Sequence, residues 1–253
     1  MNSWFRHPWR VTGRLCWLGG ELLRAALNYA VQCAFCARAA LPPARAAWLQ
    51  SSSRRVLRIF RLATRSRGQI PSRGLLVCNH LGYLDILVLA SLAPCVFVAK
   101  QEVKHWPVLG WFARLAGTVF VDRERRTQAG QTVDEIEAAL RTGALVVLFP
   151  EGTSSGGESV LPFKSSLLEC AAQPAQPLTV GFLRYELEDG DVREEVCYWK
   201  DMTLVPHLIN LLSKSAVRAS VYFNPLPAGN ADRKQLAHEL HAEVLRLKQA
   251  TAI

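Results

Sequence analysis

Hydrophobic and polar positions follow two different patterns along the chain. From residue 74 onward, apolar runs of strand length alternate with segments of helical spacing. Strands are predicted at 75–78, 96–99, 118–121, 144–149, 178–183, 194–199 and 218–223. Helices are predicted from residue 85, and at 132–140, 161–172, 206–212 and 232–249. This alternation predicts an α/β fold, a mixed sheet flanked by helices.

The N-terminal third is amphipathic. Residues 15–36 are mostly apolar, but a polar stripe recurs at helical spacing, made of Arg14, Glu21, Arg24, Asn28 and Gln32. We expect a helix that lies in a membrane interface, because charges in mid-segment would be costly at the centre of a bilayer. Two alternatives stay open, a helix buried against the body and a tilted transmembrane helix.

A second N-terminal helix is expected after Pro42 and Pro43, which should end the first one. We predict that it begins near 51–53 and extends past residue 60. One of its faces would carry Arg54, Arg58, Arg61 and Arg65. Tryptophans, which favour the headgroup level, stand at positions 4, 9, 17 and 48. We therefore divide the chain into a two-helix membrane-surface element, 1–73, and an α/β domain, 74–253.

The charge supports this division. The formal net charge is +9, yet residues 1–73 hold 13 basic side chains against a single acidic one, Glu21, whereas 74–253 hold 17 basic and 20 acidic residues. A cationic segment of this kind binds an anionic surface, such as a membrane or nucleic acid. Because the arginines accompany a large apolar face, we favour an anionic membrane surface and expect no nucleic acid.

The cysteines and the N-terminus favour a cytoplasmic location. The seven cysteines are an odd number and mostly lie in apolar runs, which is typical of free thiols in a reducing compartment. Cys33 and Cys36 form a CxxC pair, but no second pair or nearby histidine completes a zinc site. Residues 37–39 resemble a signal-peptide cleavage site, but Glu21 and Arg24 within the apolar region argue against one.

The segment 75–85 carries the first candidate chemistry. It combines a short apolar run, a polar turn with Gly82, and a helix start. His80 stands at the strand end and Asp85 follows five residues later. Across a tight turn, the aspartate can bind one ring nitrogen and leave the other free to act as a base. The alternative is an ordinary polar pair, since this spacing is common by chance.

Two more strand ends carry polar residues. Arg123 follows the run 118–121, where a guanidinium could bind a phosphate or simply lie in an exposed charged turn. Glu151 and Gly152 follow the run 144–149, and Gly152 would let the backbone approach a ligand. The loop is neither a nucleotide-type phosphate loop nor a nucleophile elbow.

Three blocks of sequence resemble those of a known family. They are Asn79-His80 with Asp85, the run Gly-Thr-Val-Phe-Val-Asp-Arg at 117–123, and Phe-Pro-Glu-Gly-Thr-Ser-Ser at 149–155. In this order they are similar to the blocks of the bacterial 1-acylglycerol-3-phosphate acyltransferases and related lysophospholipid acyltransferases. The resemblance covers about residues 70–230. One departure is Val180, which stands where the family usually has a proline and puts the acyl-chain preference in question.

The resemblance implies a mechanism. His80 would take the proton of an acceptor hydroxyl, Asp85 would orient it, and the hydroxyl would attack an acyl thioester directly. Arg123 and the loop at Glu151 and Gly152 would hold the acceptor.

We add three residues to the expected substrate-binding set: Asn79 and Thr153 from within these blocks, and Lys100 from outside them. The donor would be acyl-CoA or acyl carrier protein, and no metal or redox cofactor is expected.

Three hypotheses follow from the resemblance. The first is acylation of 1-acylglycerol 3-phosphate to phosphatidic acid, and the second is acylation of another lysolipid, such as lyso-ornithine lipid. The third, a non-catalytic lipid-binding membrane protein, is disfavoured because His80, Asp85 and Glu151 are all intact. We expect the protein on the cytoplasmic face of the inner or plasma membrane, monotopic or with one N-terminal membrane helix.

Overall fold

The computed structural model describes residues 7–33, 36–121, 129–169, 177–227 and 232–251. In this part of the chain, seven strands form one mixed sheet in the order β1-β7-β6-β2-β5-β3-β4. The strands are β1 Leu62–Arg67, β2 Gly74–Cys78, β3 Val96–Lys100, β4 Val119–Val121, β5 Leu145–Leu148, β6 Leu178–Leu187 and β7 Val217–Leu226. The β6–β7 pair is antiparallel and the other pairs are parallel. The expected α/β fold is confirmed.

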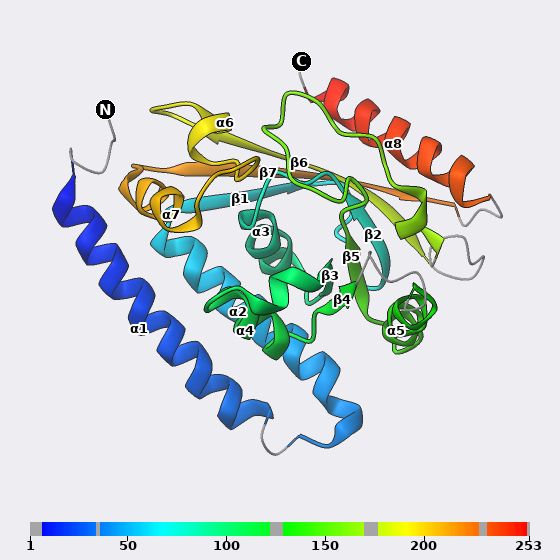
Figure 1. Ribbon diagram of the computed structural model, residues 1–253, viewed down its shortest axis with the longest axis horizontal. Coiled ribbons are helices and arrows are strands. Elements are labelled where there is room, and N and C mark those ends of the chain that lie inside the picture. The colour runs from blue at the N-terminus through cyan, green and yellow to red at the C-terminus, as the bar shows by residue number, and fades with distance from the viewer. Residues whose placement is uncertain (1–6, 34–35, 122–128, 170–176, 228–231, 252–253) are drawn as a thin grey trace.

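Helices cover both faces of the sheet (Figure 1). One face packs against α2 Leu41–Ile59, α3 Leu84–Leu92 and α7 Leu204–Ser213, and the other against α5 Ala129–Arg141 and α8 Arg233–Ala250. Shorter pieces are η2 Arg38–Ala40, η3 Gln101–His105, α4 Leu109–Leu115, η5 Ser165–Leu167 and α6 Val192–Glu195. Because both faces are buried, the central strands are continuously apolar.

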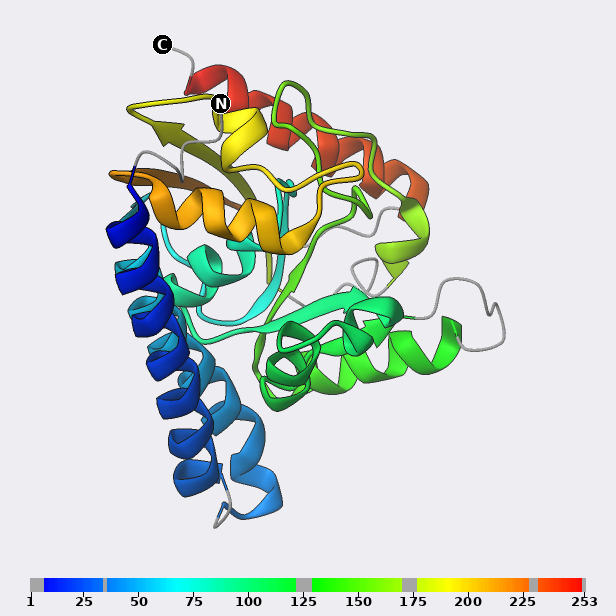
Figure 2. The same ribbon diagram turned by 60° about the vertical axis from the view of Figure 1, so that its left-hand side comes forward.

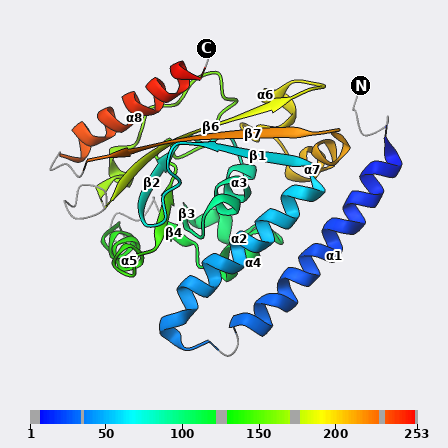
Figure 3. The same cartoon turned by 180° about the vertical axis from the view of Figure 1, so that it is seen from behind.

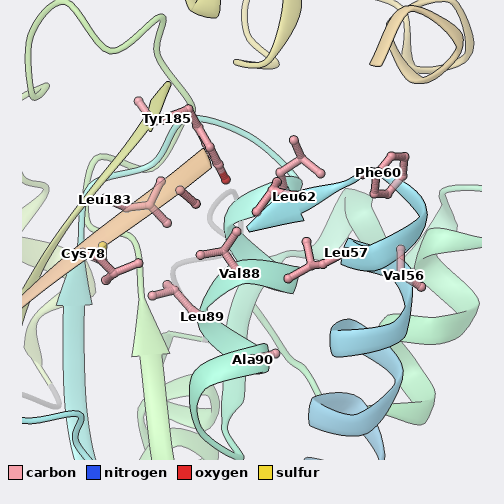
Figure 4. Packing of buried hydrophobic residues seen from close by; sticks show 14 of the residues in the cluster. Val56, Leu57, Phe60, Leu62, Cys78, Val88, Leu89, Ala90, Leu183 and Tyr185 are labelled. Atoms are coloured by element: carbon pink, nitrogen blue, oxygen red, sulfur yellow. The ribbon is translucent and has the colours of Figure 1, made fainter. Parts of the chain in front are cut away.

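The larger core lies where α2 and α3 meet the sheet (Figure 4). Leu76 and Cys78 of β2 point into it, whereas Leu75 and Val77 point into the core on the other face. Tyr185 projects from β6 into the first core, beside α3. The start of α3 is thus held inside the molecule, next to the end of β2.

The first helix, α1 Pro8–Cys33, lies antiparallel to α2 and forms a hairpin with it (Figure 3). Trp48 joins the two helices, because its indole nitrogen donates to the carbonyl of Ala25 at 2.8 Å and its ring stacks on Phe112 of α4. Trp48 is 1% exposed. Its predicted place at the headgroup level is therefore wrong, since the ring fills the space between three helices.

Two members of the polar stripe of α1, Arg14 and Glu21, face the protein body, whereas Gln32 is exposed. The guanidinium of Arg14 is buried and donates to the carbonyls of Leu212 and Lys214, at 2.9 and 2.6 Å. The end of α7 (orange in Figure 2) lies beside the first part of α1. Glu21 is buried as well and pairs with Arg24 and Arg55. Arg14 is thus held against the body, because the carbonyls that end α7 supply partners for its buried cation.

The outer face of α1 is apolar and exposed. Its large exposed side chains are Trp9, Leu15, Trp17, Leu23, Leu27 and Val31. Among the helices of the described residues, none is long and apolar enough to pass through a bilayer. The outer face of α1 thus carries large apolar side chains, while its inner face combines Arg14 and Glu21 with apolar residues such as Leu18 and Ala25.

The second helix begins earlier than predicted. It starts at Leu41, and Pro42 and Pro43 lie in its first turn, where the missing amide hydrogens are not needed. It ends at Ile59, after which Arg61 takes a positive φ of 51° and β1 pairs with β7. The predicted continuation through residue 65 is wrong. Because β1 is an edge strand with mostly exposed residues, it leaves little apolar signal.

Two other predicted elements are absent from the described residues. Instead of a helix over 161–169, the chain forms a single turn at 165–167, because the amides of Leu161 and Lys164 donate to Glu151 and Pro150. Residues 170–172 lie outside the described part. In place of the predicted strand at 194–199 lie the end of α6 and an irregular segment, 196–199. Asp191 caps α6 by accepting from the amides of Arg193 and Glu194.

Candidate active site

The candidate site lies at one edge of the sheet. Strands β3, β5, β2 and β6 are parallel neighbours, so their carboxyl ends meet there. His80 follows β2, Glu151 follows β5, and Lys100 ends β3. Open α/β sheets bind their ligands at this edge.

His80 and Asp85 form a hydrogen-bonded pair. The His80 Nδ1 atom lies 2.8 Å from Asp85 Oδ2. Because a carboxylate only accepts, Nδ1 carries the hydrogen and Nε2 keeps its lone pair. The imidazole is 22% exposed and the carboxylate is fully buried. The pair therefore presents a base that a substrate can reach, with its tautomer set from behind.

The Asp85 carboxylate accepts from four donors. The backbone amides of Leu81 and Gly82 donate to Oδ2 at 2.6 and 3.0 Å, together with His80, and the hydroxyl of Tyr185 donates to Oδ1 at 2.7 Å. A buried charge needs such partners. Gly82 is required in this turn, because a Cβ there would lie 2.8 Å from the backbone nitrogen of Tyr198.

The imidazole also has an aromatic support. The ring of His80 stacks on Phe149, with centroids 4.3 Å apart and planes 17° from parallel. Phe149 in turn stacks on Phe97 of β3. Together with the Asp85 contact, this stack restricts the imidazole to one plane and one rotation.

Glu151 holds the backbone of the site. Its Oε1 accepts from the amide of His80 and its Oε2 from the amide of Leu161, both at 2.8 Å. Burial raises the pKa of Glu151 to about 7, and the two amides act in the opposite direction. The amide of Ser155 donates to the carbonyl of His80 at 2.9 Å. The loop after β5 thus holds both the backbone amide and the backbone carbonyl of His80.

Asn79 extends the strand ladder. Its side-chain oxygen accepts from the amide of Leu183 at 2.7 Å, and its side-chain nitrogen donates to the carbonyl of Leu183 at 2.9 Å. The last backbone partners are Cys78 and Gly181, so the carboxamide acts as one further peptide group of β2. Asn79 is 3% exposed, and this geometry supports a structural role better than substrate contact.

The other predicted substrate-binding residues are placed as follows. Gly152 is buried with a positive φ of 73°, a conformation that favours glycine. Thr153 is exposed beside it, and Lys100 is exposed at the end of β3. Arg123 lies outside the described residues. The structure thus brings Asn79, Glu151 and Gly152 to the pair of His80 and Asp85, with Lys100 two strands away.

Three residues of the site were missed in the sequence. Phe149 and Ser155 belong to the third block. The block identified this loop as a candidate site, but it did not indicate that these two residues contact His80. Tyr185 lies in the middle of a strand, 100 residues from Asp85. Its only signal is general, because a tyrosine in a buried strand needs a partner for its hydroxyl.

A cavity of about 380 Å³ borders the turn that joins His80 to Asp85. Asn79, Leu81 and Tyr185 form part of its wall, together with residues 182–184 of β6, the loop at 156–160 and residues in and beside α6. It therefore touches residues that hold Asp85 in place.

Comparison with known proteins identifies the family. A family model described as Acyltransferase matches residues 61–208. The chain belongs to the acyltransferase family. The chain is 38% identical to lyso-ornithine lipid O-acyltransferase of Rhizobium meliloti over 200 aligned residues. The alignment covers 74% of the chain and 66% of that relative. The chain therefore matches just under two thirds of the relative's length.

Two further similarities concern 1-acylglycerol-3-phosphate acyltransferases. The chain is 34% identical over 143 residues to 1-acyl-sn-glycerol-3-phosphate acyltransferase of Neisseria gonorrhoeae. This alignment covers 53% of the chain and 56% of that relative. The fold of the chain matches the crystal structure of the 1-acyl-sn-glycerophosphate acyltransferase of Thermotoga maritima, with a TM-score of 0.62 and 19% identity over 91% of the chain and 87% of that structure.

Proposed function

We propose that this protein transfers a fatty acyl chain from a thioester, acyl-CoA or acyl carrier protein, to the hydroxyl of a lysolipid. The pair of His80 and Asp85 carries this proposal. Nε2 of His80 takes the hydroxyl proton while the oxygen attacks the thioester carbonyl, and Asp85 stabilises the resulting imidazolium. The C–S bond then breaks, and the leaving thiolate takes the proton back from His80.

The first candidate acceptor is a lyso-ornithine lipid. The relative that bears this name in Rhizobium meliloti shares 38% identity over 74% of the chain. The relative from Neisseria gonorrhoeae shares 34% over 53%. These similarities favour the second of our sequence-based hypotheses over the first. Lysophosphatidate (1-acylglycerol 3-phosphate) stays as the second candidate, since the three sequence blocks resemble those of its acyltransferases.

A panel of acceptors tests this proposal. The purified protein is given acyl-CoA or acyl carrier protein with lyso-ornithine lipid or lysophosphatidate, and the products are measured by lipid mass spectrometry. We expect faster acylation of lyso-ornithine lipid and complete loss in His80→Ala, with His238→Ala on the exposed face of α8 as the matched control. Faster phosphatidate formation would overturn the acceptor, and activity retained in His80→Ala would overturn the mechanism.

Arg123 offers a second test of the acceptor. A guanidinium binds a phosphate well, and the ornithine headgroup has none. If a lyso-ornithine lipid is the acceptor, Arg123→Ala should leave its turnover nearly unchanged while lowering any residual activity on lysophosphatidate. An equal loss on both acceptors would show that Arg123 does not discriminate between them.

We also infer that α1 attaches the protein to an anionic membrane as a monotopic protein on the cytoplasmic face. The exposed apolar face of α1 and the excess of arginines in residues 1–73 support this placement. A lysolipid would then reach His80 from the membrane on which the enzyme lies.

A further inference from the structure

Among the described residues, four groups donate hydrogen bonds to the Asp85 carboxylate. Of these four, the hydroxyl of Tyr185 comes from a distant strand. Three donors from the catalytic turn, His80, Leu81 and Gly82, bind Oδ2. Oδ1 accepts from the hydroxyl of Tyr185 at 2.7 Å. The Tyr185 ring comes from β6 and is embedded in the core that α3 and the sheet share (Figure 4).

The two oxygens therefore differ in what holds them. Oδ2 belongs to a local turn that forms with the motif itself. Among the contacts of the described residues, Oδ1 is held by Tyr185 through the tertiary packing of β6, and without Tyr185 it would be a buried charged atom that has lost a donor. The same loss would leave more of the negative charge on Oδ2, beside the ring of His80.

Tyr185 is suited to remain a donor. Burial raises the pKa of its hydroxyl well above the usual range, and the neighbouring Asp85 raises it further. The phenol therefore stays protonated wherever the enzyme is active. Its side chain is 6% exposed and its ring is packed by the core, so the hydroxyl has one fixed direction.

We propose that Tyr185 is a positioning residue for acyl transfer, which acts by holding Asp85 Oδ1 so that Oδ2 stays aligned with His80 Nδ1. This inference rests on the proposed function of the pair. The hydroxyl also draws charge away from Oδ2, which moderates the attraction between Asp85 and the imidazolium. Tyr185 thus sets both the direction and the basicity of His80 without touching a substrate.

Other ionisable groups surround Asp85. They are Cys78 from β2, Glu151 from the loop after β5, and Cys197 from the segment after α6, besides His80 in its own turn. Burial raises the pKa of both thiols, that of Cys197 to about 12, so they stay neutral. Glu151, with a pKa of about 7, titrates in the working range. A titration that observes His80 itself is therefore needed.

Tyr185→Phe tests the inference, because it removes the hydroxyl and keeps the ring. We expect kcat to fall roughly three- to thirtyfold with KM nearly unchanged, since a hydrogen bond to a charged group is lost. Without the hydroxyl, Asp85 holds the imidazolium more tightly. The acid limb of the kcat/KM profile and the titration of ¹⁵N-labelled His80 should both move to higher pH. Tyr222→Phe, on the neighbouring strand β7, is the matched control.

A second variant covers the case in which Tyr185→Phe does not fold. Replacing Tyr185 with 3,5-difluorotyrosine keeps the hydroxyl and makes it a stronger donor, so the acid limb should move to lower pH. In an Asp85→Asn background, Tyr185→Phe should cause little further loss if it acts through Asp85. Unchanged kcat and pH profiles in these variants, or a loss confined to KM, would overturn the inference.

The outcomes distinguish this inference from the proposed function. If His80→Ala retains activity, the proposed mechanism fails whatever Tyr185 does. If His80→Ala is inactive and Tyr185→Phe matches the wild type in kcat and pH profile, only the role of Tyr185 is wrong.

Discussion

The carboxylate of Glu151 binds the backbone amide of His80, with Oε1 2.8 Å from the amide nitrogen. Its other oxygen binds the amide of Leu161 in the same manner. The family resemblance had suggested that Glu151 holds the acceptor. In the structure both oxygens are engaged within the protein, so we infer that Glu151 affects the reaction through the position of His80.

Glu151→Gln should therefore lower kcat more than it raises KM for the acceptor. The glutamine keeps the size of the side chain but presents an NH₂ group to one of two amide donors. We expect the displaced turn to reduce kcat by about tenfold or more. Steady-state kinetics with varied acceptor separate the two constants. The control is Glu158→Gln, whose side chain lies in the same loop and is 70% exposed. A rise in KM alone would instead indicate direct acceptor binding.

The difference in the free energy of unfolding between the wild type and Glu151→Gln should change with pH. As pH rises from about 5 to about 7, the wild type should lose stability relative to the variant. The pKa of Glu151 is raised from 4.5 to about 7, so in this window the folded state binds the proton more tightly than the unfolded state. Linkage then requires stability to be greatest below the window and to be lost across it, by on the order of 2–3 kcal/mol. Denaturant unfolding at several pH values measures this difference. A wild-type advantage that grows with pH would contradict the assignment.

The features that the sequence predicted well are those that depend on short-range pattern. The central strands were found because both faces of the sheet are covered, which leaves continuous apolar runs such as 144–149. The pair of His80 and Asp85 was found because the turn that joins them is only a few residues long. Gly82 and the helix start at Leu84 bring them together locally.

The features that were missed depend on distant partners. The polar stripe of α1 has the same spacing whether it faces water or a protein. The inward direction of Arg14 is decided by the carbonyls at the end of α7, about 200 residues later, which accept from its guanidinium. The segment 161–169 has helical spacing, but its amides donate to Glu151 and Pro150 instead. The periodicity of a segment contains no information about hydrogen-bond partners that lie far away in the sequence.

Asn79→Asp should destabilise the protein and lower its activity. The substitution removes the donor to the carbonyl of Leu183 and places a negative charge against that carbonyl. We expect a loss of about 1–3 kcal/mol in the free energy of unfolding, because the pair is buried. Denaturant unfolding measures it, with Asn28→Asp on the half-exposed surface of α1 as the control. Wild-type stability together with a raised KM would return Asn79 to the substrate-binding set.

Charged residues on the outer face of α1 should weaken membrane binding while the fold persists. Leu23 and Leu27 are 63% and 61% exposed, so Leu23→Glu with Leu27→Glu removes no packing within the protein. Losing two apolar side chains from a lipid interface should weaken binding to phosphatidylglycerol vesicles at least about tenfold. Vesicle sedimentation measures binding, and thermal unfolding should stay unchanged. Wild-type binding by this variant would show that another surface attaches the protein.

Arg14→Ala should have the opposite effect, because it removes contacts of α1 with the body and leaves the outer face intact. Its guanidinium binds two carbonyls at the end of α7, at 2.9 and 2.6 Å. Losing hydrogen bonds from a buried cation should lower the free energy of unfolding by about 2–3 kcal/mol. Vesicle binding should persist, because Leu23 and Leu27 still present the apolar face. If Arg14→Ala released the protein from vesicles as completely as the glutamate variant, the outer face of α1 would not be sufficient for attachment.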